Sequence, residues 1–304
     1  MQRIVSLLPS ATEIVCALGA ADQLVGISHE CDFPDAIRDR PVLTRSRIDP
    51  SGSSLAIDRA VRSVIAGALS IYDVDADRLS RLAPDLIVTQ DLCDVCAVSL
   101  DDVRAAVARL AHRDAIAIVA LRPTRLGHVL DDLERVAAAL GRPDRGATVR
   151  AHLAARIADI ARRAAGLAAR PRVVSLEWIN PLMLGGTWMP ELIELAGGHP
   201  VGATAGAPAP TVTAAELAAL APDVIVVKPC GFTLARALDE RGILERHLAA
   251  CPGRPRIYVT DGNAYFNRSG PRLVESLEIM AACLHPDAFA DFHRTHAAVI
   301  ARLA

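Results

Sequence analysis

Aromatic side chains make up only 3% of this 304-residue sequence, and lysine occurs once, as Lys228. Long apolar runs are also missing, since no segment approaches the roughly 18 unbroken apolar residues that a membrane-spanning helix requires. The formal net charge of −2 gives no excess positive charge for binding nucleic acid or an anionic membrane. With 52% of its residues hydrophobic, the composition instead predicts a globular protein with a well-buried core.

The sequence also lacks the common catalytic templates. The turn after the first expected strand has neither a Walker A nor a GxGxxG pattern, and no GxSxG or HExxH motif occurs. Carboxylates at strand ends, such as Glu30, Asp91, Glu177 and Asp261, could serve acid–base chemistry, but such residues also cap helices. We therefore expect a binding protein and not an enzyme.

The N-terminus does not resemble a signal peptide. Its apolar run from Ile4 follows a single basic residue, Arg3, and is broken by Pro9, Ser10 and Glu13. The seven cysteines are an odd number, which favours reduced thiols over a disulfide framework. These two features predict a cytoplasmic protein that does not insert into a membrane.

Short β-branched segments alternate with longer stretches rich in Ala, Leu and Arg, which predicts parallel sheets built from strand–helix units. The expected strands are Arg3–Leu7, Leu24–Ser28, Asp85–Thr89, Ala115–Ala120, Arg172–Leu176, Val224–Lys228 and Arg256–Thr260, with weaker candidates near Leu182 and His199. The phrase RLSRLAPDLIVTQ has a counterpart later in the chain, AAELAALAPDVIVVK. This duplication indicates two related lobes.

A strand-free stretch with helical periodicity separates the two phrases, from about residue 126 to 167. It contains no Gly/Ser-rich linker, so a rigid helical connector is expected. We predict an α/β fold with two Rossmann-like parallel-sheet lobes joined by a long helix. The expected division is an N-terminal lobe over 1–124, a connecting helical region over 125–169 and a C-terminal lobe over 170–304.

The scarce aromatics gather just after the expected strands. Ligands of open parallel sheets bind beyond the carboxyl ends of the strands, so these positions are candidate contacts in the cleft between the lobes. A flat, mostly apolar ligand would be held by Trp178, Phe232, Tyr265 and Phe266, with Tyr72 or Trp188 as further contacts. Asn267 and Arg268 would bind its polar edge. The alternative is that the aromatics only pack between loop and sheet.

Two further strand-end sequences, HEC and CDVC, bring together His29, Cys31, Cys93 and Cys96. The Cys-x-x-Cys spacing lets two thiolates share one metal ion, so a zinc or iron–sulfur site is one interpretation. A second interpretation is a redox dithiol, or His29 as an axial ligand to a bound cobalt. The third is that the thiols are small buried packing groups.

Three segments carry a family resemblance: SLLPSATEIVCALGAADQLVGISHECDFP, LAPDLIVTQ and YFNRSGPRLVESLEIM. They resemble the cobalamin-binding members of the periplasmic binding-protein superfamily, which serve ABC importers. The resemblance implies a class III binding-protein fold and cobalamin as the ligand. It also implies that Tyr265, Phe266, Arg268 and the neighbouring Pro271 and Arg272 help to line the corrin site, with Tyr72 as a contact from the first lobe.

The chain departs from the importer pattern at the two carboxylates that dock on the permease. The corresponding positions hold Asp77 and Ala215, with Glu216 one step away, so docking on an ABC permease is doubtful. The HEC, CDVC and PCG sequences resemble instead a cytosolic-type subgroup that is described as cobalamin-binding. The leading hypothesis is non-catalytic binding of cobalamin or a related corrinoid. The alternatives are a cytosolic metal-binding or redox protein, and the substrate-binding component of a vitamin B12 importer.

Overall fold

The computed structural model describes residues 1–66, 71–90, 100–108 and 116–303, which form two compact units. The N-terminal unit comprises Met1–Gly52, Ala56–Pro123 and Gly127–His152. The C-terminal unit comprises Leu153–Ala304 together with two short segments from earlier in the chain, Ser53–Leu55 and Thr124–Leu126. Each unit has its own sheet.

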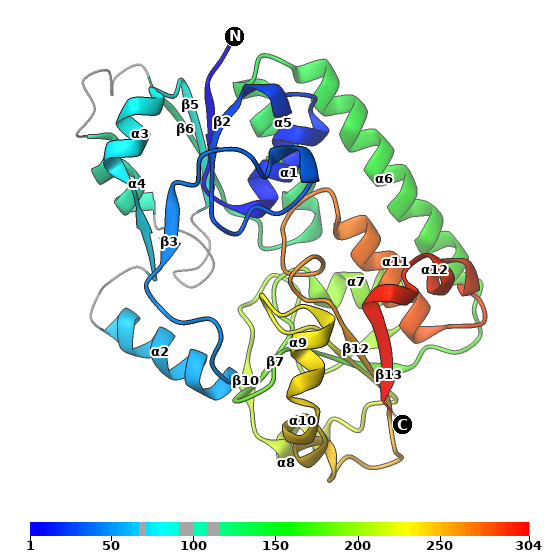
Figure 1. The fold of residues 1–304 in the computed structure, drawn as a ribbon. Helices are drawn as coiled ribbons and strands as arrows, with labels where there is room; N and C mark the ends of the chain where they lie inside the picture. The colour runs from blue at the N-terminus through cyan, green and yellow to red at the C-terminus, as the bar shows by residue number, and fades with distance from the viewer. Residues whose placement is uncertain (67–70, 91–99, 109–115, 304) are drawn as a thin grey trace. The chain divides into compact units, whose positions relative to one another are not determined.

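The N-terminal unit is built on a four-stranded sheet in the order β2-β1-β5-β6. Its strands are β1 (Ile4–Ser6), β2 (Leu24–Ile27), β5 (Leu86–Gln90) and β6 (Ala117–Leu121), and all neighbours pair in parallel. The two central strands, β1 and β5, are buried along their whole length, including the polar residues at their carboxyl ends, Ser6, Thr89 and Gln90. Because the strands are parallel, their carboxyl ends meet at one edge of the sheet (Figure 1).

A short antiparallel pair, β3 (Thr44–Ser46) and β4 (Tyr72–Val74), completes this unit. Leu43, Ile71 and Tyr72 at its ends join the core cluster that also contains Leu7 and Ile87. The sequence did not predict this pair, because three-residue strands are too short to show a period.

The C-terminal unit has a mixed sheet in the order β10-β8-β7-β11-β12-β13, with β9 added to β7. Its parallel centre is β7 (Arg172–Trp178), β11 (Val224–Val227) and β12 (Arg256–Thr260), with β9 (His199–Pro200) parallel to β7. The antiparallel strands are β8 (Leu182–Leu184), β10 (Thr211–Val212) and β13 (Ile300–Leu303). The expected parallel strands are therefore present, but the edges of this sheet are antiparallel.

Helices cover both sheets and connect the strands. They are α1 (Pro9–Ala17), α2 (Ser54–Ala66), α3 (Ala76–Leu82), α4 (Leu100–Val107), α5 (Leu126–Ala139), α6 (Pro143–Ala165), α7 (Met189–Leu195), α8 (Ala214–Ala219), α9 (Leu234–Asp239), α10 (Arg241–Leu248), α11 (Leu273–Leu284) and α12 (Ala290–Thr295). Short 3₁₀ turns occur at Ala21–Gln23, Asp35–Ile37 and Ala297–Val299. In the part of the chain that the structure describes, no helix combines the length and apolarity that crossing a membrane demands.

The long helix α6 has 23 residues, and the boundary between the units falls within it, after His152 (Figure 1). Its first part is tied to α5, because Arg150 pairs with Glu134 at 2.7 Å. Its second part is tied to α11, because Arg156 pairs with Glu278 at 2.6 Å. The chain thus has two α/β units joined by a long helix, as the sequence predicted.

Candidate functional site

In the N-terminal unit, His29 follows β2 and its side chain is exposed. Its ring atom Nδ1 lies 2.7 Å from the hydroxyl of Thr44, which also accepts the His29 backbone N–H at 3.0 Å. That hydroxyl in turn donates to the Ser28 hydroxyl at 2.9 Å. Burial lowers the pKa of His29, although the neighbouring Glu30 carboxylate opposes the shift. Thr44 therefore fixes a neutral ring in one orientation.

Tyr72 lies beside this histidine, with ring centroids 5.3 Å apart. Its hydroxyl donates to the Glu30 carboxylate at 2.8 Å, and the side chain is largely buried. Only a small part of the Tyr72 side chain is therefore available for a ligand contact. In contrast, Phe33 from the same loop is 44% exposed.

Cys31 is buried, and its sulfur lies 3.0 Å from the Thr12 hydroxyl. Thr12 also donates to the Ser6 hydroxyl at 2.8 Å, so the thiol joins a small hydroxyl network. Cys93 and Cys96 lie outside the described residues. Among the residues that are described, no group of three or more His, Cys, Asp or Glu side chains could hold a metal ion.

The C-terminal unit has a buried ion pair at the carboxyl ends of its central strands. Lys228 directly follows β11, is completely buried, and donates to Glu177 Oε2 at 3.1 Å and to Asn267 Oδ1 at 3.0 Å. The Asn267 amide nitrogen donates back to the carbonyls of Lys228 and Gly262, at 3.1 and 2.9 Å. Both ends of the Asn267 side chain are thus used inside the protein. Asn267 therefore fixes the loop after β12, and its predicted contact with the edge of a ligand stays a prediction.

Trp178 ends β7 and is half-buried. Its ring packs on Phe232 with centroids 5.2 Å apart, and its indole N–H donates to the Ser54 carbonyl at 3.1 Å. Phe232 has 4% of its surface exposed, because the Arg236 guanidinium covers it at 4.4 Å from the ring centroid. Trp178 is therefore the more accessible member of this pair.

A buried carboxylate holds the segment Ser53–Leu55 in this unit. Glu240 Oε1 accepts the Ser54 backbone N–H at 2.6 Å, Oε2 accepts the Ser54 hydroxyl, and Arg236 donates to Oε1 at 3.1 Å. Ser54 is the first residue of α2, so Glu240 satisfies a backbone donor that a helix start leaves free. No pattern in the sequence links residues so far apart.

The loop after β12 contains both core and half-buried residues. Phe266 has no exposed surface, and its φ angle is 63°. Its backbone N–H donates a hydrogen bond to the Ser276 hydroxyl, and its carbonyl accepts one from the Trp188 indole N–H. Phe266 and Trp188 therefore pack in the core of this unit, which leaves Phe266 no exposed surface for the predicted ligand contact. Tyr265 is half-buried against His296, with ring centroids 6.2 Å apart, and Arg268 is largely buried.

Replacing Gly262 by alanine is expected to lower the free energy of unfolding by about 1–3 kcal/mol, as overpacking does. An added Cβ would overlap the Pro229 carbonyl and lie 2.6 Å from the Lys228 carbonyl carbon, and both are backbone atoms that cannot rotate away. The matched control is Gly242→Ala in α10, where the nearest atom is a flexible arginine tip at 3.8 Å. Urea unfolding should show a loss only at Gly262, and equal midpoints would contradict the prediction.

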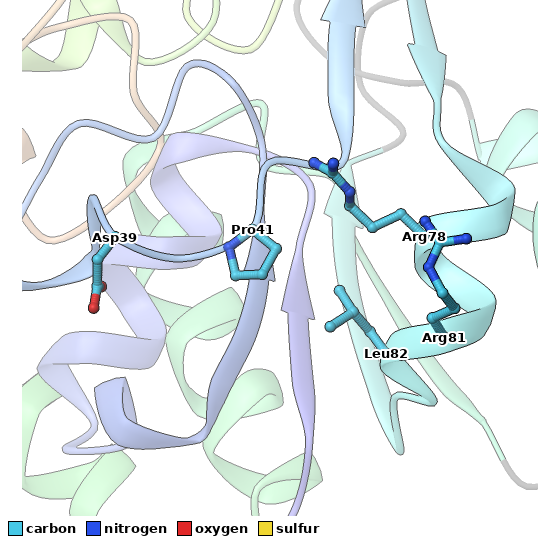
Figure 2. A pocket seen from close by; sticks show the side chains of 5 residues that line it. All are labelled: Asp39, Pro41, Arg78, Arg81 and Leu82. Atoms are coloured by element: carbon cyan, nitrogen blue, oxygen red, sulfur yellow. The ribbon is translucent and has the colours of Figure 1, made fainter.

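One open groove lies in the N-terminal unit. It has a volume of about 470 Å³ and is lined by Asp39, Pro41, Arg78, Arg81 and Leu82. Figure 2 shows Arg78 extending from α3 toward Pro41, while the Arg81 side chain lies along the helix. Arg78 is engaged there, because it donates to the Val42 carbonyl at 2.7 Å. None of the residues expected to bind a ligand lines this groove.

The two acids considered for docking lie in the first turns of short helices. Asp77 is in α3, and Glu216 is in α8, where it forms a capping box with Thr213. The hydrogen bonds from Thr213 lower the pKa of Glu216. Glu216 thus stays ionised and exposed, while Ala215 beside it carries no charge.

A family model described as "Periplasmic binding protein" matches residues 4–250. Among solved structures, a periplasmic heme-binding protein from Pseudomonas aeruginosa is 20% identical, with 94% of this chain and 93% of that chain covered and a TM-score of 0.69. The periplasmic vitamin B12 binding protein BtuF of Vibrio cholerae is 19% identical, with 96% of this chain and 98% of that chain covered and a TM-score of 0.65. The periplasmic heme-binding protein RhuT from Roseiflexus sp. RS-1 is 24% identical, with 96% of this chain and 98% of that chain covered and a TM-score of 0.67.

Comparison with curated protein sequences gives no significant match. The prediction of a cytoplasmic location is wrong, because the matching family and these three structures are described as periplasmic. The odd cysteine count misled the prediction, since unpaired thiols such as buried Cys283 can simply be packing groups. The family match spans well over half of the sequence, and the chain therefore belongs to the periplasmic binding protein family.

Proposed function

We propose that this protein is a non-catalytic solute-binding protein of an ABC importer and that its solute is a metal-centred tetrapyrrole, with cobalamin as the first candidate. The observation that supports the proposal best is the pair of half-buried aromatics at the carboxyl ends of the central strands, Trp178 and Tyr265. Aromatic faces suit a flat apolar macrocycle, and a buried arginine nearby in the sequence, Arg268, suits its amide or carboxylate edge.

Heme is the second candidate. Two of the similar structures are described as heme-binding proteins and one as a vitamin B12 binding protein, at comparable TM-scores. Both ligands are planar macrocycles around a metal, so the same aromatic groups would serve either. The proposal includes a permease as partner, with Asp77 and Glu216 as the exposed acids available to it.

A direct titration tests the proposal. The purified protein is titrated into aquocobalamin, cyanocobalamin and hemin, and the change in visible absorbance is followed together with fluorescence quenching of the two tryptophans. Saturable binding of one macrocycle at a one-to-one ratio is expected. Absence of saturable binding to all three would contradict the proposal.

Trp178→Ala is expected to weaken macrocycle binding by roughly ten- to a hundred-fold, because loss of an aromatic platform typically removes about 1–3 kcal/mol. The matched control is Phe292→Ala, which removes a partly buried aromatic on α12 that stacks on Phe289. Affinities come from the absorbance titration, and circular dichroism confirms that both variants are folded. Equal affinities for the two variants would exclude Trp178 as a contact.

A further inference from the structure

One nitrogen of the His29 ring is held by a hydrogen bond, and the other has no hydrogen-bond partner among the described residues. Nδ1 lies 2.7 Å from the Thr44 hydroxyl, whereas no hydrogen-bond partner for Nε2 occurs within the described part of the chain. His29 as a whole is an exposed residue, so its ring lies at the surface of the N-terminal unit.

The hydrogen bonds of Thr44 determine which nitrogen of the neutral ring holds the proton. A hydroxyl has one proton to donate and two lone pairs with which to accept. The Thr44 proton goes to the Ser28 hydroxyl at 2.9 Å, and the backbone N–H of His29 occupies one lone pair at 3.0 Å. In this arrangement of hydrogen bonds, Nδ1 donates its proton to the second lone pair. The neutral ring has its proton on Nδ1 and a bare lone pair on Nε2.

This arrangement is the one that metal-binding histidines use, because the nitrogen that does not bind the metal donates to a fixed acceptor. The neighbouring groups do not provide a complete metal site. The Cys31 sulfur faces the Thr12 hydroxyl, and no group of three or more metal-binding side chains exists among the described residues. A single imidazole can bind a metal ion whose other ligands are supplied by the molecule that carries the metal.

A metal in a tetrapyrrole meets that condition, since the macrocycle fills four positions and needs only axial ligands. The surroundings of His29 suit such a ligand. Phe33, from the same loop, is 44% exposed and offers an apolar face. Tyr72 is less suited to bind the metal, because its hydroxyl is committed to Glu30 at 2.8 Å.

We propose that His29 Nε2 is the axial ligand to the iron or cobalt of a tetrapyrrole bound by this protein, an inference that rests on the proposed function. The Nε2 lone pair replaces a water molecule on the metal, and that water leaves. No electron is transferred, and the proton on Nδ1 remains hydrogen-bonded to Thr44. Thr44 is a positioning residue, because it acts only through the ring.

The test titrates hemin and aquocobalamin, whose axial water can be exchanged, and cyanocobalamin, whose upper cyanide is held tightly. The wild type is expected to shift the absorbance bands of at least one exchangeable macrocycle to those of its imidazole complex. His29→Ala is expected to lose this shift and to bind that macrocycle about ten-fold or more weakly, in line with the usual cost of disturbing a metal ligand. Added imidazole should restore the shifted bands in His29→Ala. Thr44→Val should reduce the shift by a larger factor than it reduces the affinity for cyanocobalamin.

The control is His152→Ala, which removes an exposed histidine from α6. Its spectra should equal those of the wild type. If macrocycles bind but His29→Ala keeps the shifted bands, the axial-ligand inference is overturned and the proposed function stands. If no macrocycle binds to the wild type, both are overturned.

Discussion

Glu177→Leu is expected to lower the free energy of unfolding by about 3–5 kcal/mol, the usual cost of leaving a buried charge without its partner. Lys228 is completely buried, and Glu177 is its only anionic partner among the described residues, at 3.1 Å. After the substitution the ammonium group would retain only the neutral Asn267 oxygen at 3.0 Å. Chemical denaturation followed by circular dichroism measures the change.

A double-mutant cycle separates the ion pair from simple packing. Lys228→Met alone should cost less than Glu177→Leu, because the Glu177 side chain is 25% exposed and can be hydrated. The double variant should recover much of the stability, since it leaves no buried charge. If the two single effects simply add in the double variant, the two side chains are not coupled and the prediction is wrong.

Glu240→Ala is expected to cost about 2–4 kcal/mol of unfolding free energy, because hydrogen bonds to a charged group contribute about 1.5–3 kcal/mol. The carboxylate accepts two hydrogen bonds from Ser54, which is completely buried, and one from Arg236. The alanine variant would leave the Ser54 N–H and hydroxyl without acceptors. Thermal and denaturant unfolding provide the readout.

Two variants calibrate this effect. Glu240→Gln keeps one acceptor oxygen and should lose about half as much stability. Glu245→Ala, in the helix α10 that Glu240 precedes as N-cap, removes an exposed carboxylate whose ion pair among the described residues is with Arg241 at 2.6 Å. Exposed pairs contribute little, so its effect should be close to zero. A loss for Glu245→Ala as large as that for Glu240→Ala would show that the burial of Glu240 is irrelevant.

The sequence predicted the strands well because each central strand is a short run of β-branched residues with clear ends. Val224–Val227 and Arg256–Thr260 were expected within one residue of where the structure has them. The pair β3 and β4 was missed because its pairing depends on contacts between segments that are distant in the chain. The two units are thus largely encoded by local pattern.

The site was harder to predict because the same residue types serve both core and surface. Phe266 follows Tyr265 directly, yet a positive φ angle and a hydrogen bond to Ser276 turn it into the core. No local pattern reports a hydrogen bond made ten residues away. Lys228 did carry a signal, because a single lysine at the end of a buried strand needs a partner. That signal predicts an acidic partner at the carboxyl ends of the strands, but only the structure identifies it as Glu177.

The allocation of Ser53–Leu55 to the C-terminal unit has a consequence for cutting the protein into fragments. Cleavage between His152 and Leu153 follows the main boundary, but it leaves this segment on the N-terminal piece. The C-terminal fragment would then lack the Ser54 carbonyl that accepts the Trp178 indole N–H, and the Ser54 N–H and hydroxyl that donate to buried Glu240. The C-terminal half is therefore not a self-sufficient expression unit, and a soluble fragment would need residues 53–55 supplied as a separate peptide or grafted through a new loop.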